Sequence, residues 1–521
     1  MASNPPDHRS KVQQTVAESI QQAAVPASGG SRLTPSRIVA FAVLASIPVK
    51  AIADRLSDPD LWWHLRTGGL IASTKRIPAV DPFSYTAPGE PWVVQEWGAE
   101  VILHWIHSLF GLYGILFYRG LALLAVYALM ARLILKRMGG GLATWAWIAL
   151  AAYTGIPNWT ERPNLMSFFL FVATLLLVER RDKAIWWFVP LAALWANLHG
   201  MVILGIGLLV VIAGAEWLKV AFRWDGAERT WATRVSLVAG AGLLATVANP
   251  EGPGLLVHAF RLVGVAGAIV SEWRSPNFHD PGAWLFTAML FLTILVFVFS
   301  PKRPDLTDIA LALAFTFLAL QAVRNLAVAG IVLGIASAPY VRPAFSVLPW
   351  RPKPRDEVSE GASRILGVAG YAAATLGLVA VLVTGFPRSS DPSDIISGYP
   401  VASIDRLDVP GARVFSYDVW SGMVIHRAWP NARVYIDLRW DFYGLELSTS
   451  YADTINGLSS WQRNLDRSCT THVLIPPGVA LATILRLSVD WRIVDRDPDA
   501  ATTFARREPA PGCDEHPIPA I

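Results

Sequence analysis

Charged side chains are scarce in this chain of 521 residues. Asp, Glu, Lys and Arg make up 16% of the sequence and hydrophobic residues 53%, whereas soluble proteins carry about 25% charged residues. This shortage excludes an ordinary water-soluble enzyme. Cysteine is also scarce, since Cys469 and Cys513 are the only two, which excludes a cysteine-rich scaffold and a zinc site of four thiolates. The net formal charge of +4 is too small in so long a chain to indicate a nucleic-acid partner, and we expect none.

The sequence instead contains a series of long apolar runs. A helix needs about 20 mostly apolar residues to cross a bilayer, and spans inside a large bundle can be shorter or tilted. We therefore predict a polytopic α-helical membrane protein with about 11 spans. Three further stretches, 58–73, 92–110 and 254–272, are amphipathic and predict helices at the membrane interface. The predicted spans are 37–53, 111–135, 142–157, 164–178, 184–197, 200–218, 235–249, 283–300, 306–321, 325–341 and 363–386.

The loops between the predicted spans differ in their content of Lys and Arg. Basic residues are more than twice as numerous in one alternating set of loops, which includes the N-terminal segment. Because basic loops stay in the cytoplasm, we predict a cell-membrane protein with a cytoplasmic N-terminus and an extracytoplasmic C-terminus. Residues 1–36, rich in Gln, Ser, Ala and Pro, predict a disordered cytoplasmic tail, and residues 37–386 are the predicted membrane domain.

Residues 387–521 have a different pattern and predict an extracytoplasmic α/β domain. Short β-rich runs alternate there with helical ones, as in small α/β layer domains. Both cysteines lie in this domain, in a compartment where disulfides persist, so they could form a bond. Cys513 lies in a Pro-rich tail, however, and a loose tail would leave the two cysteines unpaired. We predict strands at 413–417, 433–438, 472–475, 491–494 and 502–505, and helices near 420–429, 448–466 and 478–488.

Two carboxylates, Asp58 and Asp60, stand in the first predicted outer loop. Carboxylates at this spacing can coordinate a divalent metal such as Mg²⁺ or Mn²⁺, or one of them can take the proton of an acceptor hydroxyl. Helix capping explains the same residues: Asp58 is a good N-cap, Pro59 suits the first helical position, and Asp60 complements the helix dipole. The sequence leaves catalysis, metal binding and capping open.

Aromatic and polar residues gather on the predicted outer side. Trp faces can hold a sugar ring, although interfacial belts place Trp at the same depth in any membrane protein. Arg is suited to phosphate and indicates a function when it lies inside a span, although an ion pair between helices explains it as well. The candidate substrate-binding residues are Trp62, Trp63, His64, Arg119, Arg162, Asn197, His199 and Arg324.

Two further groups have suggestive spacing. Glu96, Glu100, His104 and His107 would line one helix face, but the sequence has no H-E-x-x-H motif, and a polar stripe on an interfacial helix has the same spacing. The segment 437–441, with Asp437, Arg439, Trp440 and Asp441, follows a predicted strand at the sheet edge where α/β domains place ligands. It predicts either acceptor recognition or a structural cap. No P-loop, G-x-S-x-G or dinucleotide fingerprint supports nucleotide hydrolysis or serine-hydrolase chemistry.

The layout of residues 37–386 resembles that of the GT-C glycosyltransferases: a first span, an outer loop with Asp-x-Asp, an amphipathic helix, many spans and a C-terminal outer domain. The strings DPDLWWHLRTGGLI, DPFSYTAPGEPWVVQEW and VYIDLRWDFYG are similar to those of bacterial multi-span proteins to which we assign no activity. The resemblance implies a polyprenyl-phosphate-linked sugar as donor, and Asp58 or Asp60 as base or metal ligand. No Trp-Trp-Asp motif of oligosaccharyltransferases matches, because His64 follows Trp62 and Trp63.

We therefore expect a cell-envelope glycosyltransferase that moves a sugar from a polyprenyl-phosphate-linked donor to an extracytoplasmic acceptor, with membrane lipid as a partner. The alternative is a non-enzymatic membrane transporter or assembly subunit for lipid or polysaccharide. A transporter predicts repeated halves with corresponding mid-bilayer charges, and the sequence shows no such repeat. A cavity open to the outer leaflet, in which Asp60 and an arginine face each other, favours the enzyme. A first loop packed shut, with carboxylates that only cap helices, favours the alternative.

Overall fold

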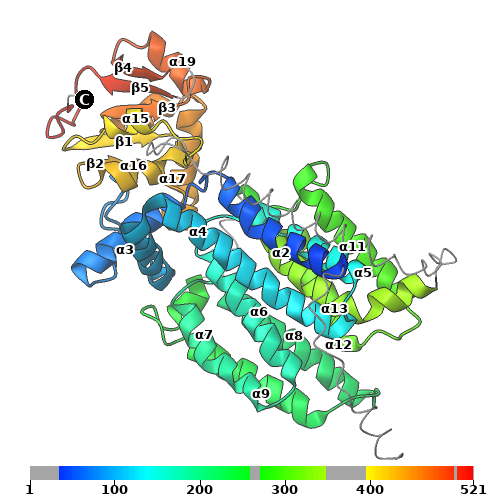
Figure 1. Cartoon of the computed structure of the whole chain (residues 1–521). Coiled ribbons are helices and arrows are strands. Elements are labelled where there is room, and N and C mark those ends of the chain that lie inside the picture. Colours follow the sequence, from blue (N-terminus) through cyan, green and yellow to red (C-terminus); the bar gives the residue numbers. More distant parts are fainter. Residues whose placement is uncertain (1–34, 259–269, 348–394, 498–500, 520–521) are drawn as a thin grey trace, which may run out of the picture.

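The computed structural model describes residues 35–258, 270–347, 395–497 and 501–519. A long helical bundle carries a small sheet domain at one end, and helix α3 (Leu61–Thr74) lies beside their junction (Figure 1). The predicted tail 1–36 and the predicted interfacial stretch 254–272 lie mostly outside the described residues, and the predicted span 363–386 lies wholly outside them.

The apolar runs that predict spans form the helices of the bundle. Within the described residues, five helices are long and apolar enough to cross a membrane, and shorter apolar helices pack among them. The count of eleven spans stays a prediction. The five are α2 (Pro35–Ala53), α4 (Trp97–Met138), α8 (Val202–Ala221), α11 (Pro281–Phe299) and the segment Val323–Ser346, which holds η4 (Val323–Asn325) and the largely buried α13 (Leu326–Ser346). The others are α5 (Leu142–Tyr153), η1 (Ile156–Asn158), α6 (Asn164–Arg180), η2 (Lys183–Trp187), α7 (Phe188–Ala196), α9 (Arg229–Ala245), η3 (Ser271–Trp273) and α12 (Leu306–Gln321).

Helix α4 bends at Gly111, where the backbone φ of 62° is a value that glycine adopts without a steric cost. Before the bend, Trp105, Leu109 and Phe110 are exposed, as expected of a helix that lies in the membrane interface. After the bend, the helix follows the second predicted span. The predicted interfacial helix and the predicted span are thus two parts of one bent helix.

The sheet domain has five strands in the order β2-β1-β3-β5-β4. Strand β1 (Ala412–Ser416) pairs in parallel with β2 (Ala432–Val434) and β3 (His472–Ile475), whereas β5 (Ala501–Arg506) pairs antiparallel with β3 and β4 (Trp491–Asp497). The five predicted strands are confirmed, although β2 is shorter than predicted. The helices are α15 (Val401–Asp405), α16 (Asp418–Ala428), α17 (Trp440–Ile455), α18 (Trp461–Arg467) and α19 (Ala480–Leu487), so the single helix predicted at 448–466 is two.

The first loop is joined to the sheet domain through strand β2. The backbone N–H of Val434 donates to the carbonyl of Phe83 at 3.1 Å, and the N–H of Tyr85 donates to the carbonyl of Val434 at 3.1 Å. Buried side chains of α3, among them Trp62, share one apolar core with strand residues such as Val414. The loop that follows the first helix is therefore held against the sheet domain by both backbone and core contacts.

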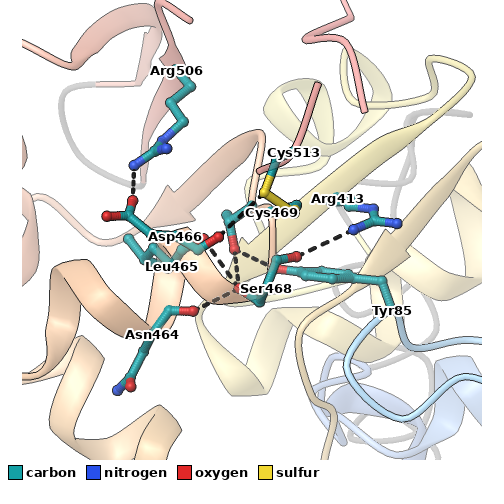
Figure 2. Close-up of a disulfide and its surroundings, with 10 residues drawn as sticks. Tyr85, Arg413, Asn464, Leu465, Asp466, Ser468, Cys469, Arg506 and Cys513 are labelled. Atoms are coloured by element: carbon teal, nitrogen blue, oxygen red, sulfur yellow. Dashed lines mark hydrogen bonds and ion pairs between the residues drawn. A yellow bond between two sulfur atoms is a disulfide. The ribbon is translucent and has the colours of Figure 1, made fainter. Parts of the chain in front are cut away.

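The two cysteines form a disulfide in the sheet domain (Figure 2). Cys469 and Cys513 are 44 residues apart in sequence, and their Cα atoms lie 5.6 Å apart. Beside the bond, Arg506 forms an ion pair with Asp466, at the end of α18. The structure thus settles the pairing that the sequence left open: the bond fastens the Pro-rich C-terminal tail to the turn after α18.

Candidate active site

A polar cavity of about 460 Å³ lies where the first loop, the bundle and the sheet domain meet. Residues at or just before the starts of α3, α4, α6 and α8 line it, and the turn after β2 closes it from the sheet domain. Six of the predicted site residues line this cavity: Asp60, Trp63, His64, Arg162, His199 and Arg324. The other four, Asp58, Trp62, Arg119 and Asn197, lie behind its wall.

Asp60 contacts an arginine, and both side chains line the cavity. Its Oδ2 lies 3.2 Å from Nη2 of Arg162, and its Oδ1 accepts a hydrogen bond from Nε1 of Trp63 at 3.1 Å. Burial raises the pKa of Asp60 to about 6, although the charge of Arg162 acts in the opposite direction. A carboxylate with a pKa near neutrality can accept a proton from a bound hydroxyl group.

Asp58 supports Asp60 and does not cap a helix. One of its carboxylate oxygens accepts the backbone N–H of Asp60 at 3.0 Å, and the other bonds Nε of Arg162. Helix α3 begins only at Leu61, with Asp60 as the N-cap residue and no capping bond from its side chain. Asp58 is therefore not the N-cap, because the helix starts two residues later than the capping interpretation requires, whereas Asp60 does stand at the helix N-terminus, where its charge complements the dipole.

The donor set of the first loop does not fit a metal ion. Arg162 forms ion pairs with both Asp58 and Asp60, so the two carboxylates are not free to coordinate one metal ion together. Over the ranges that the structure describes, no group of three or more His, Cys, Asp and Glu side chains is placed to hold a metal ion. We derive no step through Mg²⁺ or Mn²⁺ for this reason.

Glu161 fixes the first loop, although its role has no signal in the sequence. Its Oε1 accepts the backbone N–H groups of Ser57 and Asp58, each at 3.0 Å, and its Oε2 lies 2.5 Å from Nη1 of Arg119. Arg119, which is 2% exposed, also donates to the carbonyl groups at the end of α2. The geometry thus favours the ion-pair interpretation of Arg119 over phosphate binding, because both of its terminal nitrogens are engaged and the residue does not line the cavity.

A second carboxylate in the cavity, Glu96, bridges two histidines. Its Oε1 lies 3.1 Å from Nε2 of His199, and its Oε2 lies 3.4 Å from Nε2 of His64. Burial acts to raise the pKa of Glu96, but the two histidines outweigh it and hold the pKa at about 2. Burial acts to lower the pKa of His64, yet its hydrogen bond to Glu100 and the charge of Glu96 raise it. Glu96 is therefore a fixed negative charge between two imidazoles.

The predicted stripe on α4 divides between two places. Glu100 lies 3.0 Å from Nδ1 of His64, and both residues line the cavity. The ring of His107 packs against His426 of the sheet domain, with centroids 5.5 Å apart, and His104 packs against Trp105. The two carboxylates thus line the cavity, whereas the two histidines lie further along α4 and do not line it.

Trp63 and Trp92 give the cavity an aromatic wall. Their ring centroids are 6.2 Å apart, and the guanidinium carbon of Arg439 lies 4.3 Å from the centroid of Trp92. Trp62 is 1% exposed in the core of α3 and the sheet domain, so it offers no free face. Asn197 accepts a hydrogen bond from Nε1 of Trp97 at 3.0 Å and positions the start of α4. Trp63 and Trp92 therefore line the cavity, and Trp62 does not.

The two cavity arginines differ in their partners. Arg162 pairs with three carboxylates, those of Asp58, Asp60 and Glu272. Arg324 lies 3.9 Å from Glu272 and 4.2 Å from the ring centroid of Trp273. Since its one ion pair within the described ranges is long, Arg324 is the cavity cation that retains the most capacity to bind an added anion.

The sheet domain contributes a buried charge cluster to the cavity wall. Arg439 Nη2 lies 2.6 Å from Asp437 and 2.8 Å from Asp81, so it ties the turn after β2 to the first loop. Nη1 of the same guanidinium is buried without a hydrogen-bond partner. Trp440 and Asp441 line the cavity beside it. Of the two interpretations of segment 437–441, the structural one fits Asp437, whereas Arg439 keeps a donor free.

An apolar groove adjoins the polar cavity. It has a volume of about 820 Å³ and lies between α4 and the start of α6. The groove reaches Leu165 and Leu198, whose chain neighbours Asn164 and His199 line the polar cavity. The polar cavity and the apolar groove are therefore neighbours in the bundle.

No protein-family model matches the chain, and neither does any curated protein. Solved structures do match. The archaeal oligosaccharyltransferase AglB from Archaeoglobus fulgidus, in complex with an inhibitory peptide and a dolichol-phosphate, has a TM-score of 0.52 at 12% identity, over 84% of this chain and 69% of that one. The apo form of the Archaeoglobus fulgidus oligosaccharyltransferase gives 0.53 at 12% identity over the same shares. ArnT from Cupriavidus metallidurans, bound to undecaprenyl phosphate, gives 0.47 at 13% identity over 90% and 97%.

These likenesses define the class of fold. The chain is a multi-pass membrane protein with the GT-C fold and a C-terminal sheet domain, as the sequence predicts. At 12% identity the oligosaccharyltransferase structures carry the fold and not the reaction. The chemistry has to be argued from the cavity of this chain.

Proposed function

We propose that this protein is a glycosyltransferase that moves a sugar from a polyprenyl-phosphate-linked donor to an extracytoplasmic acceptor. The observation that carries the proposal is the cavity in which Asp60 faces Arg162 at 3.2 Å. A buried carboxylate whose pKa is raised toward neutrality, in a cavity, is typical of a group that exchanges a proton with a bound substrate. The likeness of fold to an oligosaccharyltransferase structure that holds a dolichol-phosphate supports the same assignment.

Asp60 is the proposed base. In an inverting transfer, the acceptor oxygen bonds to the anomeric carbon of the sugar while the bond from that carbon to the phosphate oxygen breaks. The acceptor proton passes to Asp60, and the bond electrons leave with the lipid phosphate. Asp58 and Arg162 hold the Asp60 carboxylate in position, since both bond to it or to its backbone.

Arg324 is the proposed phosphate ligand, because its only ion pair among the described residues is the 3.9 Å contact with Glu272. Positive charge placed where the leaving phosphate develops its charge stabilises the transition state. The adjoining groove of about 820 Å³ suits the prenyl chain, since its walls are almost wholly apolar. Trp63 and Trp92 are the proposed platform for the sugar ring.

The test is a substitution at Asp60 in purified protein reconstituted with polyprenyl-phosphate sugars extracted from native membranes. We expect Asp60→Asn to lower release of free polyprenyl phosphate by roughly 100- to 10,000-fold, as for loss of a general base. Asp54→Asn is the matched control, because this carboxylate lies six residues earlier in the same loop and is exposed outside the cavity. Full activity of Asp60→Asn, with membrane abundance unchanged, would refute the assignment.

A further inference from the structure

A second polar cavity, of about 560 Å³, lies at the opposite end of the bundle. The proposed active site lies near the starts of α4, α6 and α8, whereas this cavity lies where the same helices end and α12 begins. The proposed transfer uses none of its residues. We call it the far cavity.

The charges in the inner wall of the far cavity are paired with one another. Glu216, which is fully buried, lies 2.8 Å from Lys219 and 3.2 Å from Arg181. Arg137 lies 2.7 Å from Glu179 and 2.9 Å from Asp308. The inner wall is thus close to electrically balanced.

Two cations at the mouth of the far cavity stand outside these pairs. The guanidinium carbon of Arg303 lies 4.3 Å from the ring centroid of Trp224, and Nζ of Lys302 lies 5.2 Å from that of Tyr340. Both contact aromatic faces and form no ion pair with a carboxylate in the described part of the chain. Two acids line the cavity near these cations: the exposed Asp225, and Asp305, whose carboxylate lies 3.2 Å from Nζ of Lys219. Because Asp305 is already paired with Lys219, the two cations at the mouth leave an excess of positive charge over Asp225 alone.

The wall of the far cavity also has an unused acceptor and an unused donor. Oε2 of Glu216 and Nε1 of Trp231 are both buried without a hydrogen-bond partner. Leaving such a group unpaired costs roughly 1–3 kcal/mol. A ligand hydroxyl can donate to the carboxylate oxygen and accept from an indole N–H, so a hydroxyl-bearing group suits this wall.

The mouth of the far cavity adjoins an apolar surface. Phe222, two residues before Trp224, is 74% exposed, and Phe299, three residues before Lys302, is 53% exposed. Large exposed apolar side chains on a membrane protein mark the surface that contacts lipid. A lipid headgroup next to this surface can therefore reach Lys302 and Arg303.

We propose that the far cavity binds a phosphate ester that carries hydroxyl groups. The phosphate lies between Lys302 and Arg303, and a hydroxyl group donates to Glu216. Two sources share this chemistry: the headgroup of an anionic glycerophospholipid, and a soluble polyol phosphate.

The test measures binding of phosphatidylglycerol and of soluble glycerol 3-phosphate to the full chain in detergent, by native mass spectrometry. Each basic residue near a lipid phosphate contributes about 1 kcal/mol, or about fivefold in affinity, so Lys302→Gln with Arg303→Gln should weaken binding about 25-fold. The matched control is Lys183→Gln with Arg223→Gln, which removes two exposed cations at the same end of the bundle but outside the far cavity. All four side chains are exposed, so circular dichroism should show unchanged helix content.

Phosphatidic acid completes the test, because it keeps the phosphate and lacks the headgroup hydroxyls. Tighter binding of phosphatidylglycerol than of phosphatidic acid supports the role of Glu216. Binding of the lipid alone assigns the site to a membrane lipid, and comparable binding of glycerol 3-phosphate assigns it to a soluble ligand; both outcomes support the proposal. Equal losses in the two double variants, or phosphatidic acid binding at least as well as phosphatidylglycerol, would overturn it.

Discussion

Glu161 offers the sharpest test of how the first loop is held, because Glu161→Gln changes one charge and almost no shape. Glutamine keeps an oxygen that accepts the backbone N–H groups of Ser57 and Asp58, which Glu161 accepts at 3.0 Å. The substitution removes the ion pair with Arg119, which is 2% exposed. Leaving such a charge buried without its partner costs roughly 3–5 kcal/mol.

We therefore expect Glu161→Gln to lower the free energy of unfolding by about 3–5 kcal/mol and the transfer rate by roughly 100-fold. The rate falls because Asp60 sits on the loop that Glu161 fixes, and a displacement of about 1 Å of a reacting group has a cost of this size. Denaturant unfolding in detergent micelles and release of polyprenyl phosphate measure the two quantities. Glu179→Gln is the control, because it breaks the ion pair with Arg137 at the other end of α6, far from Asp60. It should lose stability and keep the transfer rate.

A double variant separates charge from packing. Adding Arg119→Met to Glu161→Gln removes the stranded charge and fills the same space with apolar atoms, so most of the lost stability should return. A Glu161→Gln variant as stable and active as the parent would refute the reasoning. A double variant no more stable than Glu161→Gln would refute the assignment of the loss to the buried charge of Arg119.

The remaining predictions concern protonation, the bend and the disulfide. With the pKa of Asp60 raised to about 6, the transfer rate should fall roughly tenfold as the pH falls from 7 to 5, because the base becomes protonated; a flat profile contradicts the role of Asp60. Gly111→Ala, at φ 62°, should cost about 1–2 kcal/mol of stability, whereas Gly207→Ala inside α8 should gain about 0.5–1 kcal/mol in the same unfolding assay. Equal effects would argue against the bend. Cys469→Ser with Cys513→Ser should lower the free energy of unfolding by about 2–4 kcal/mol and leave transfer intact, and loss of transfer would tie the sheet-domain tail to the active site.

Periodicity in the sequence predicts most of the fold. Apolar runs predict the bundle helices, and alternating short runs predict the five strands, because local hydrophobic pattern determines both. Strand β2 ends at Val434, earlier than predicted, and the chain then enters a turn in which Asp437 accepts the backbone N–H of Arg439. The long helix predicted at 448–466 is divided near Gly457, where φ is 66°. Such turns depend on single residues, which a window of hydrophobicity does not register.

The candidate site was only partly predictable. Asp60, Arg162 and Arg324 are accessible to sequence reasoning because charged residues at span ends are unusual. Glu161 has the same signal, beside Arg162, but its role is not accessible, because the N–H groups that it accepts lie more than 100 residues earlier in the chain and no local pattern connects them. The sequence predicts a phosphate ligand at Arg119 because this arginine lies inside a predicted span. The structure instead shows that Arg119 pairs with Glu161. Pairings between distant segments require the fold.

The most direct measurement of the central claim is mass spectrometry of lipid that co-purifies with the protein in mild detergent. A polyprenyl phosphate, free or sugar-linked, should be retained by the parent chain. Arg324→Gln should release it, since this guanidinium is the proposed phosphate ligand. The parent chain without any prenyl lipid, or with the same amount of it as Arg324→Gln, would contradict the account.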